Sequence, residues 1–503
     1  MAPLSIVNKL TKRLERENIS YCHWKSNEHV DAAVQGKTDL DVLVDCTKQE
    51  QLEAILPQIG FKYFEAIPSR KYRDIVDYLA VDEETGTLVH LHLHYQLELG
   101  EKQLKGYHVP WEEQILSTRI YDRQHQIYIA EPNIEIILLI VRAALKVRNR
   151  DRLKGLIGYD YFKGDFIREF RWLKARIELS HVKQLSETLL GANATELILD
   201  AIADDANLKQ LLSPNNAIRS ALKEYRYYHP VLATILRWNR ERKDISHKIL
   251  TRIFHAPVVT RRTPVKGGAI VAVLGADGSG KSTVISEIAN SLSKKLDVLP
   301  VYLGSGDGKA STLRQPLILM ARGAKAARSI KSSNTSGSQD GHKVKSTKKR
   351  SLLSRLNKLL WAITLTYEKQ NKLKQAYLAK ERGMIVICDR YPQSQIMGFN
   401  DGPLLANSKG NSSKLLHDLQ QWEFESYHHM AETMPPDLVI KLNITPEVAL
   451  TRKPETPSEV VHKKVAAVQA LKFPSQTTVI TLDAEQPLDK VLVKAKRAVW
   501  DSL

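Results

Sequence analysis

The sequence predicts an α/β protein of several domains, whose C-terminal part is a parallel sheet flanked by helices. From Ala269 onward, short apolar runs alternate with amphipathic helical stretches, as in a parallel sheet with helical crossovers. A glycine-rich motif stands between the first of these runs and the helix that follows it. The chain has 503 residues, which is enough for about three domains of ordinary size.

Four segments are expected along the chain. Residues 1–130 alternate short helices with β-forming stretches and predict an α+β domain, with strands at 40–44, 74–81, 88–95 and 126–130. Residues 131–255 carry long amphipathic stretches with few turn residues, which predicts a helical connector. Residues 256–268 contain two prolines and a glycine pair and predict a linker, so 269–503 remains as the C-terminal domain.

The composition excludes several classes of protein. Apolar residues make up 43% of the chain and charged residues 26%, which is ordinary for a folded protein and excludes global disorder. The 3 cysteines form no closely spaced pair, so neither a disulfide scaffold nor a zinc ribbon is expected. No apolar run is long enough for a transmembrane helix, and the first residues resemble an amphipathic helix, so we expect a cytoplasmic protein.

The positive charge is concentrated in one segment of the C-terminal part. Between Arg322 and Arg355 there are ten Lys or Arg and one acid, which accounts for half of the net charge of +18. The centre of this segment, 332–350, has one aliphatic residue and no aromatic one, so it buries too little to become ordered. We expect a disordered basic insertion near 328–351. It is either a solvated loop or a contact for a polyanion such as nucleic acid, acidic polysaccharide or lipid.

The glycine-rich motif has the context of a phosphate-binding loop. An apolar strand precedes it, and a helix with an apolar stripe follows it. The glycines let the backbone wrap phosphate groups, which face the N–H groups of the helix start. Lys281 is expected to reach the β- and γ-phosphates of ATP, and Ser282 to ligate Mg²⁺. The predicted ATP-binding residues are Gly275, Ala276, Asp277, Gly278, Ser279, Gly280, Lys281, Ser282 and Thr283.

Two later strands are followed by charged residues. The strand at 384–388 leads into Asp389 and Arg390, and ligands of open α/β sheets bind just outside such strand ends. There Asp389 can hold Mg²⁺ through water, and Arg390 can clamp an acceptor phosphate. After the next strand, Thr445 is expected to cap a helix that ends at Arg452, where cations and prolines indicate a mobile lid over the transferring phosphoryl group.

Together these motifs resemble thymidylate kinase and its nucleoside monophosphate kinase relatives. The likeness runs from about residue 269 to the end and rests on GADGSGKST, DRYPQS and PPDLVIKLNITPEVALTRK. It implies ATP and Mg²⁺ as cofactors, and it also implies a homo-oligomer. It assigns acceptor binding to Asp277, Arg390, Tyr391 and Ser394, and catalysis to Lys281, Asp389, Arg390 and Arg452.

The sequence departs from that family around the acceptor. The Phe-Arg signature of the family's base pocket is missing between residues 303 and 384, and QIMGFNDGPLL replaces the usual aromatic-Gln-Gly run. We therefore expect a small-molecule or glycan phosphoryl acceptor, which is either a nucleoside monophosphate or a diverged acceptor related to sugars or polysaccharides. Kinases of this kind with extra domains resemble those encoded near bacterial surface-polysaccharide genes.

A second charged motif lies in the N-terminal part. Asp39 and Asp41 alternate in a strand, so they share one face, which is how two-metal nucleotidyl transfer presents its carboxylates. With Ser26 at a preceding turn, the pattern resembles the nucleotidyltransferase superfamily, although Lys25 replaces the usual glycine. The resemblance implies a second metal site at Asp39 and Asp41, with a third carboxylate on a later strand.

The strand expected to carry that third carboxylate has histidines instead. Leu88–Tyr95 places His90, His92 and His94 on one face. Four interpretations remain open: an inactive binding domain, an active transferase with an altered metal shell, a separate His-x-His-x-His metal site, or a plain strand with a polar face. Histidine favours transition metals over Mg²⁺, which argues against ordinary Mg²⁺-dependent transfer.

The sequence as a whole predicts an ATP- and Mg²⁺-dependent phosphotransferase behind a nucleotidyltransferase-like domain. One alternative is a P-loop ATPase that binds nucleic acid or another polyanion through the basic insertion. The other is a nucleotide-binding regulatory protein without turnover, in which the nucleotidyltransferase-like domain is inactive.

Overall fold

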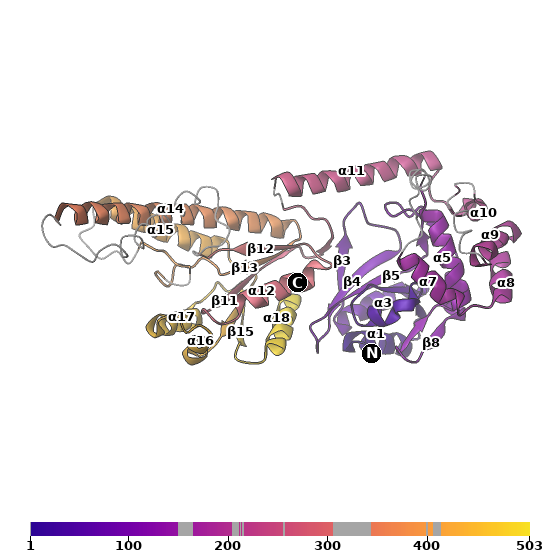
Figure 1. Cartoon of the computed structure of the whole chain (residues 1–503), viewed down its shortest axis with the longest axis horizontal. Coiled ribbons are helices and arrows are strands. Elements are labelled where there is room, and N and C mark those ends of the chain that lie inside the picture. Colours follow the sequence, from indigo (N-terminus) through magenta and orange to yellow (C-terminus); the bar gives the residue numbers. More distant parts are fainter. Residues whose placement is uncertain are drawn as a thin grey trace, which may run out of the picture. The chain divides into compact units, whose positions relative to one another are not determined.

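The computed structural model of the chain describes residues 2–148, 164–203, 211, 213, 216–254, 257–304, 344–398, 401–405 and 414–503. The chain divides into two compact units, Met1–Val265 and Lys266–Leu503 (Figure 1). Each unit contains a sheet with helices, so the predicted α/β class is confirmed. The boundary between the units lies inside the predicted linker, 256–268.

The N-terminal unit is built on a mixed sheet of eight strands in the order β10-β3-β4-β5-β2-β1-β9-β8. The predicted strands are present in it as β2, β4, β5 and β9. The strands of this unit, including the small β6–β7 pair, are β1 Tyr21–His23, β2 Leu40–Val44, β3 Lys62–Ala66, β4 Ile75–Val81, β5 Leu88–His94, β6 Glu98–Leu99, β7 Tyr107–His108, β8 Ile120–Asp122, β9 Ile127–Ile129 and β10 Arg262–Pro264.

The two faces of this sheet differ because side chains alternate along each strand. On β2, Leu40, Val42 and Val44 join a core that contains residues of α1 and α3. Leu43 points the other way and joins a second core with α4 and α5. The helices of this unit are α1 Ser5–Arg16, α2 Val30–Val34, α3 Gln49–Ile55, α4 Glu112–Thr118, α5 Pro132–Lys146, α7 Asp165–Lys174, α8 Leu179–Leu190, α9 Ala192–Ala203, α10 Ala217–Ala221 and α11 Pro230–Phe254.

The predicted helical connector, 131–255, is not a spacer of its own. Its helices from α5 to α10 share one hydrophobic core with Cys22 and Trp24 of the N-terminal region, because α5 is apolar on nearly every side and must be covered all round. The predicted linker also contributes to the unit, since β10 pairs antiparallel with β3. The connector and the linker residues up to Val265 therefore belong to the first unit, whereas 266–268 belong to the second.

The C-terminal unit contains a fully parallel sheet of five strands in the order β12-β13-β11-β14-β15. Its strands are β11 Ala269–Gly275, β12 Val298–Tyr302, β13 Ile385–Asp389, β14 Leu438–Asn443 and β15 Thr478–Asp483. Because β11 lies between β13 and β14, the strand order reverses there. Ligands of open α/β sheets bind at such a point, outside the carboxyl ends of the strands.

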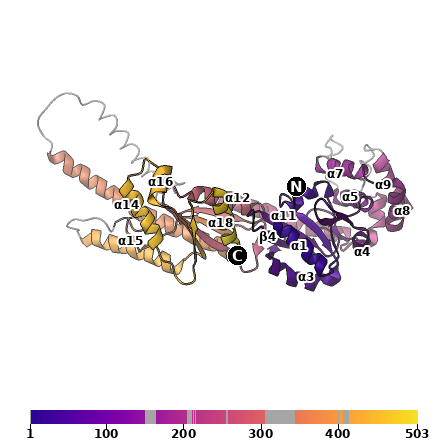
Figure 2. The ribbon, with the colours of Figure 1, turned by 90° about the horizontal axis from the view of Figure 1, so that it is seen from below.

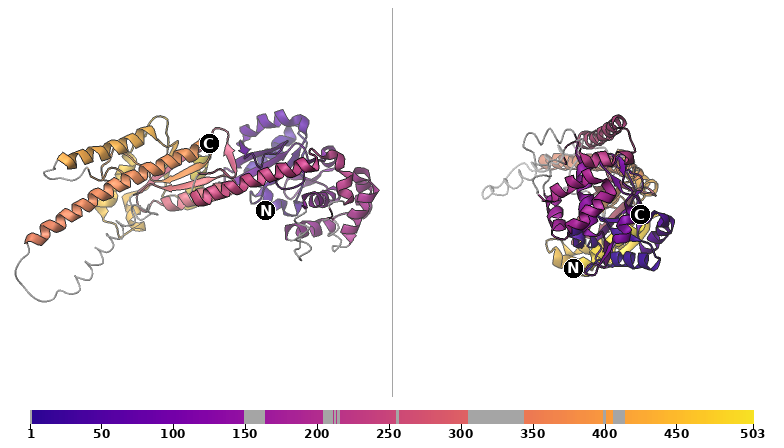
Figure 3. Two further views of the ribbon diagram at one scale, coloured as in Figure 1. Left: turned by 90° about the horizontal axis from the view of Figure 1, so that it is seen from above. Right: turned by 90° about the vertical axis from the view of Figure 1, so that its right-hand side faces the viewer.

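Helices cover both faces of this parallel sheet. Seen from above, α14 crosses over the strands (Figure 3), whereas α12 and α18 lie side by side and are visible from below (Figure 2). These helices are α12 Lys281–Ser293, α14 Val344–Glu381, α15 Lys414–Thr433, α16 Pro446–Arg452, α17 Ser458–Ala470 and α18 Leu488–Ser502. In the part of the chain that the structure describes, no helix combines the length and the apolar character that a membrane span requires.

The predicted basic insertion overlaps the start of α14. Residues 344–351 are helical, so the prediction of disorder over 328–351 extends too far toward the C-terminus. The remaining part, 328–343, lies outside the described residues.

Candidate functional sites

The phosphate-binding loop joins the central strand of the parallel sheet to α12. The backbone is left-handed at Gly278 (φ +85°) and Gly280 (φ +84°), where side chains other than hydrogen are strained. At Gly275 a Cβ atom would lie 2.3 Å from Ser279 Oγ, so only glycine fits this turn. The loop therefore needs its glycines for its shape, and α12 begins directly at Lys281 with its N–H groups toward the loop.

Lys281 is held inside the loop that it serves. Its Nζ donates to the carbonyl of Ala276 at 2.8 Å, and the side chain is buried. Burial and the nearby Arg390 lower the pKa of Lys281 to about 8, against the opposing charges of Asp277 and Asp389. A buried cation that is bonded to a carbonyl is partly unsatisfied, and an added phosphate would stabilise its charge.

Arg390 links the loop to a carboxylate that sequence reasoning missed. One guanidinium nitrogen lies 3.4 Å from Asp277 Oδ1 and the other 3.4 Å from Asp401 Oδ2. Asp401 also lies 3.3 Å from the ammonium of Lys369 on α14, and both of these side chains are almost fully buried. In the sequence, Asp401 was marked only by the Asp-Gly pair that it forms with Gly402, which is typical of turns. This pair lies in QIMGFNDGPLL, the run that departs from the kinase family.

Asp389 ends β13, beside the loop, and is the best candidate for a metal contact. Its Oδ1 is buried and has no hydrogen-bond partner among the described residues. Burial raises the pKa of Asp389, while Lys281 and Arg390 oppose that effect. An unpaired buried carboxylate oxygen is costly unless a cation or a donor from a ligand reaches it, so Asp389 fits the predicted Mg²⁺ role. Ser282, the other predicted ligand, is exposed at the start of α12.

Two cations from the α16–α17 region also reach the loop. Arg452, at the end of α16, donates to the carbonyl oxygens of Gly278 at 3.3 Å and Ala484 at 3.1 Å. Lys464 on α17 lies 2.5 Å from Asp277 Oδ2 and was not predicted. Although burial opposes it, the hydrogen bond and charge of Lys464 lower the pKa of Asp277, as do Lys281 and Arg390.

The structure brings the predicted catalytic residues to this one edge, but Tyr391, which was predicted to bind the acceptor, faces elsewhere. The Tyr391 ring is buried, and its hydroxyl donates to the carbonyl of Met434, so this side chain supports the strand end. Ser394 is partly exposed and lies 3.4 Å from His428 Nδ1. Thr445 caps α16 as expected, since its hydroxyl accepts from the N–H of Val448.

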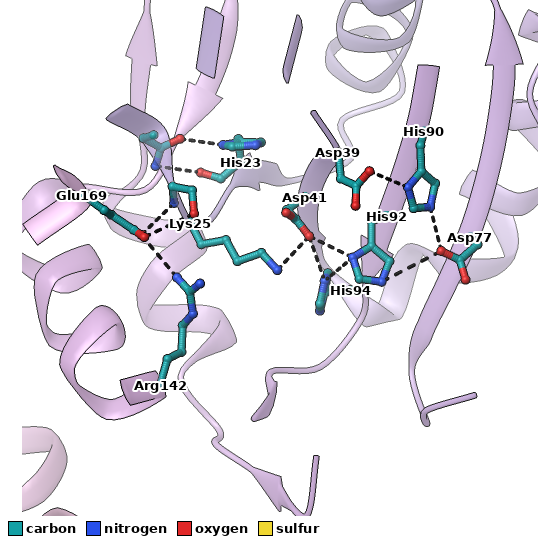
Figure 4. Close-up of polar contacts among 12 residues, drawn as sticks. His23, Lys25, Asp39, Asp41, Asp77, His90, His92, His94, Arg142 and Glu169 are labelled. Carbon is teal, nitrogen blue, oxygen red and sulfur yellow. Dashed lines mark hydrogen bonds and ion pairs between the residues drawn. The ribbon is translucent and has the colours of Figure 1, made fainter. Parts of the chain in front are cut away.

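The second candidate site lies on β2, β4 and β5 of the N-terminal unit (Figure 4). Asp41 is opposite His92 in the parallel β2–β5 pair. One oxygen of Asp41, Oδ1, lies 2.8 Å from Lys25 Nζ, 2.8 Å from His92 Nδ1 and 3.5 Å from His94 Nε2. Although burial opposes it, the charge of Lys25 and the two histidines hold the pKa of Asp41 well below its usual range.

The third carboxylate comes from a strand on which it was not expected. Asp77 of β4 stands opposite His92 across the antiparallel β4–β5 pair. Its Oδ1 lies 2.7 Å from His90 Nε2 and 2.8 Å from Arg262. His90 also reaches Asp39 at 2.8 Å through Nδ1, so it joins two carboxylates (Figure 4). Asp77 was detectable as the acid in the interior of the predicted strand 74–81, whose other acid, Asp74, stands at its first position.

Ser26, which the resemblance placed at the turn before these carboxylates, does lie in a turn. Its backbone is left-handed at φ +59°. Its N–H and hydroxyl are engaged with the carboxylate of Glu169 on α7, at 3.1 and 3.4 Å. Ser26 is therefore bound to the helical layer of the unit.

A cavity of about 800 Å³ opens beside this cluster and is lined in part by His92 and Asp77. Burial and the charge of Lys25 lower the pKa of Lys105 to about 7, and Arg142 and burial lower that of Lys146 to about 8. Crowded cations of this kind favour an anionic occupant. The basic lining includes Arg70, Lys102, Lys105, Lys146, Arg261 and Arg262.

Comparison with known proteins supports nucleotide binding but does not indicate a reaction or a substrate. The chain is similar to the uncharacterized ATP-binding protein YghS of Escherichia coli K12, with 29% identity over 246 residues, which are 49% of this chain and 97% of that protein. It is also similar to the uncharacterized ATP-binding protein YghR of the same strain, with 29% identity over 237 residues, which are 46% of this chain and 86% of that protein. No family model matches the sequence.

Proposed function

We propose that the C-terminal unit is an ATP-dependent phosphotransferase that resembles thymidylate kinase in its chemistry. The observation that carries this proposal is the meeting of Lys281, Asp389 and Arg390 at the carboxyl edge of the parallel sheet, beside a glycine-shaped loop. An ATPase that only hydrolyses needs the loop and its lysine. A kinase also needs a group that binds the acceptor, and the Arg390 guanidinium, which two carboxylates hold in place, can donate to an acceptor phosphate.

In this proposal the triphosphate lies on the N–H groups at the start of α12. Lys281 exchanges its bond to the Ala276 carbonyl for a phosphate oxygen, which stabilises its positive charge. Ser282 and Asp389 would hold Mg²⁺, which neutralises developing charge on the phosphoryl group when it is bound. Arg452 lies next to the loop at Gly278 and is placed to contact the same phosphates.

The acceptor side is formed by Asp277 and Arg390. An acceptor oxygen attacks the γ-phosphorus, a new P–O bond forms, and the bond to the bridging oxygen breaks so that ADP leaves. The local cations Lys281, Arg390 and Lys464 suit an acceptor that itself carries phosphate. We therefore place nucleoside monophosphates and sugar phosphates ahead of neutral sugars.

The test is a transfer assay with γ-labelled ATP and Mg²⁺ over nucleoside monophosphates, sugar phosphates and sugars. We expect labelled product with one acceptor class and none with the Lys281→Ala variant. ATP hydrolysis without transfer to any acceptor would support the ATPase alternative. Binding of ATP without hydrolysis would support the regulatory alternative.

The salt dependence of nucleic-acid binding distinguishes the alternative of a polyanion-binding ATPase from the kinase. This alternative depends on the basic insertion predicted near 328–351, of which residues 328–343 lie outside the described residues. Binding to nucleic acid that falls steeply with salt and is lost when 332–350 are deleted would favour that alternative.

A further inference from the structure

The cluster around Asp41 has a geometry that the phosphotransferase does not use. Three donor atoms from two neighbouring strands converge there: Asp41 Oδ1, His92 Nδ1 and His94 Nε2. The distances between them are 2.8 Å from Asp41 to His92, 3.5 Å from Asp41 to His94 and 3.3 Å between the two histidines. Two imidazole nitrogens that face each other at this distance cannot both carry a proton comfortably.

These spacings are those of ligand atoms around one metal ion. A tetrahedral centre with bonds of about 2.0–2.1 Å holds neighbouring ligand atoms about 3.3 Å apart. The three observed edges scatter around that value, so an ion could be bound with small side-chain adjustments. The strand pairing fixes two of the ligands, because Asp41 and His92 are register partners.

The groups behind the ligands have the arrangement of a second shell. The other ring nitrogen of His92, Nε2, lies 3.9 Å from Asp77 Oδ1, and Asp77 is itself held by His90 and Arg262. A metal-bound histidine commonly turns its free N–H toward such a carboxylate. The Trp24 ring packs edge-on against His94 with centroids 5.1 Å apart, which limits rotation of that imidazole.

We propose that Asp41, His92 and His94 form a binding site for a first-row transition-metal dication such as Zn²⁺ or Mn²⁺. Two nitrogen ligands and one carboxylate suit these ions, whereas Mg²⁺ and Ca²⁺ prefer oxygen ligands throughout. His92 also lines the basic cavity, so one of the three ligands lies at the wall of that cavity. Given the cations around that cavity, the group that completes the coordination is an anion of the phosphate class.

Lys25 competes with the metal for this site. Its ammonium lies 2.8 Å from the same Asp41 oxygen and provides the positive charge that a metal ion would bring. The metal can bind only when this ammonium moves away. Removing the charge of Lys25 should therefore tighten metal binding, whereas removal of a true ligand weakens it.

The experiment uses the full chain, freed of metal by a chelator and kept free of nucleotide. Zn²⁺ and Mn²⁺ are titrated against a chromophoric chelator, and Co²⁺ is added separately, because Co²⁺ bound to two imidazoles in a four-coordinate site absorbs strongly in the visible. We expect one equivalent to bind, no displacement by excess Mg²⁺, and tighter binding when inorganic phosphate is present. No binding, or binding that Mg²⁺ displaces, would overturn the proposal.

Five variants and a control test the assignment of the ligands. His92→Ala and His94→Ala should each weaken Zn²⁺ binding by about 100-fold or more, while His229→Ala, which changes an exposed histidine elsewhere in the unit, should leave it unchanged. Lys25→Met should tighten binding by about tenfold. Circular dichroism verifies folding of each variant, and His92→Cys, which keeps a metal ligand, should retain binding if the alanine variant unfolds. Equal binding by wild type and the double variant His92→Ala, His94→Ala would contradict the assignment.

Discussion

The two candidate sites use the chain in opposite ways. In the C-terminal unit, nine consecutive residues, 275–283, form the centre of the site, and the backbone itself supplies the binding groups. In the N-terminal unit, the site consists of side chains that meet only because β4, β5 and β2 pair in one register. A contiguous site can be recognised from a motif, whereas a site assembled by strand pairing becomes visible only with the pairing. Their chemistry differs accordingly: one site offers N–H groups to phosphate, and the other offers imidazole and carboxylate to a cation.

The largest expected effect separates the two sites. Lys281→Ala removes the one cation that lies inside the loop, so we expect ATP turnover to fall by about 100-fold or more. Metal binding by the Asp41 cluster should stay the same. Turnover is measured with ATP and the best acceptor. Retention of most of the turnover would contradict the assignment of the C-terminal unit.

A second test concerns the buried charges behind the loop. Asp401→Asn removes the charge that pairs with Lys369, whose side chain is 2% exposed, and we expect a loss of about 3 kcal/mol in unfolding free energy. Urea unfolding monitors the loss. Glu459→Gln, which breaks the exposed pair between Glu459 and Lys463 on α17, should unfold at the same urea concentration as the wild type.

If Asp401→Asn proves neutral, the ion pair does not stabilise the C-terminal unit. The double variant Lys369→Met, Asp401→Asn should recover part of the loss, because no unpaired buried cation remains.

A third expected effect is a pH dependence in the N-terminal unit. Burial raises the pKa of Glu135 from 4.5 to about 8, although both of its oxygens accept hydrogen bonds from Asn27. The folded chain therefore holds a proton that the unfolded chain releases, and the stability contributed by that proton is lost as the pH rises from about 4.5 to about 8.

Glu135→Gln has no such proton to lose. Its stability relative to the wild type should increase between pH 5 and pH 8, as determined from urea unfolding at both values. Glu113→Gln, which changes an exposed glutamate, is the matched control, and the difference between its unfolding free energy and that of the wild type should be the same at both pH values. A constant difference between wild type and Glu135→Gln would show that Glu135 is ionised at both values.

The sequence predicted the elements and the loop better than the partners. Strand, loop and helix were expected at 269–283 because the apolar run, the glycines and the helical stripe are adjacent, and the structure has all three. Asp401 and Lys464 were missed because both lie far along the chain from the loop: Asp401 follows β13 and pairs with Arg390, and Lys464 reaches Asp277 from α17. Distance in sequence conceals such contacts even where the local pattern is clear.

The structure adds a carboxylate to the N-terminal cluster from a strand that sequence reasoning did not consider. The resemblance implies a third carboxylate within 88–95, whereas the acid that the structure brings to the cluster is Asp77 on the antiparallel neighbour β4. Neither periodicity nor composition determines which strand lies beside which. The helical connector was separated from its domain for a similar reason, since the apolar surface of α5 does not reveal in sequence what covers it.

The short strand β10 has a consequence for how this chain can be divided or recombined. It is the outermost strand of the N-terminal sheet, yet it lies only a few residues before the boundary at Val265, and its Arg262 reaches Asp77. A gene fusion that exchanged the N-terminal half at the end of α11 would leave β3 as an open edge, which is prone to pair with other chains. Residues 1–265 should therefore be kept together in a fusion, because the part of the predicted linker up to Val265 belongs to the N-terminal unit.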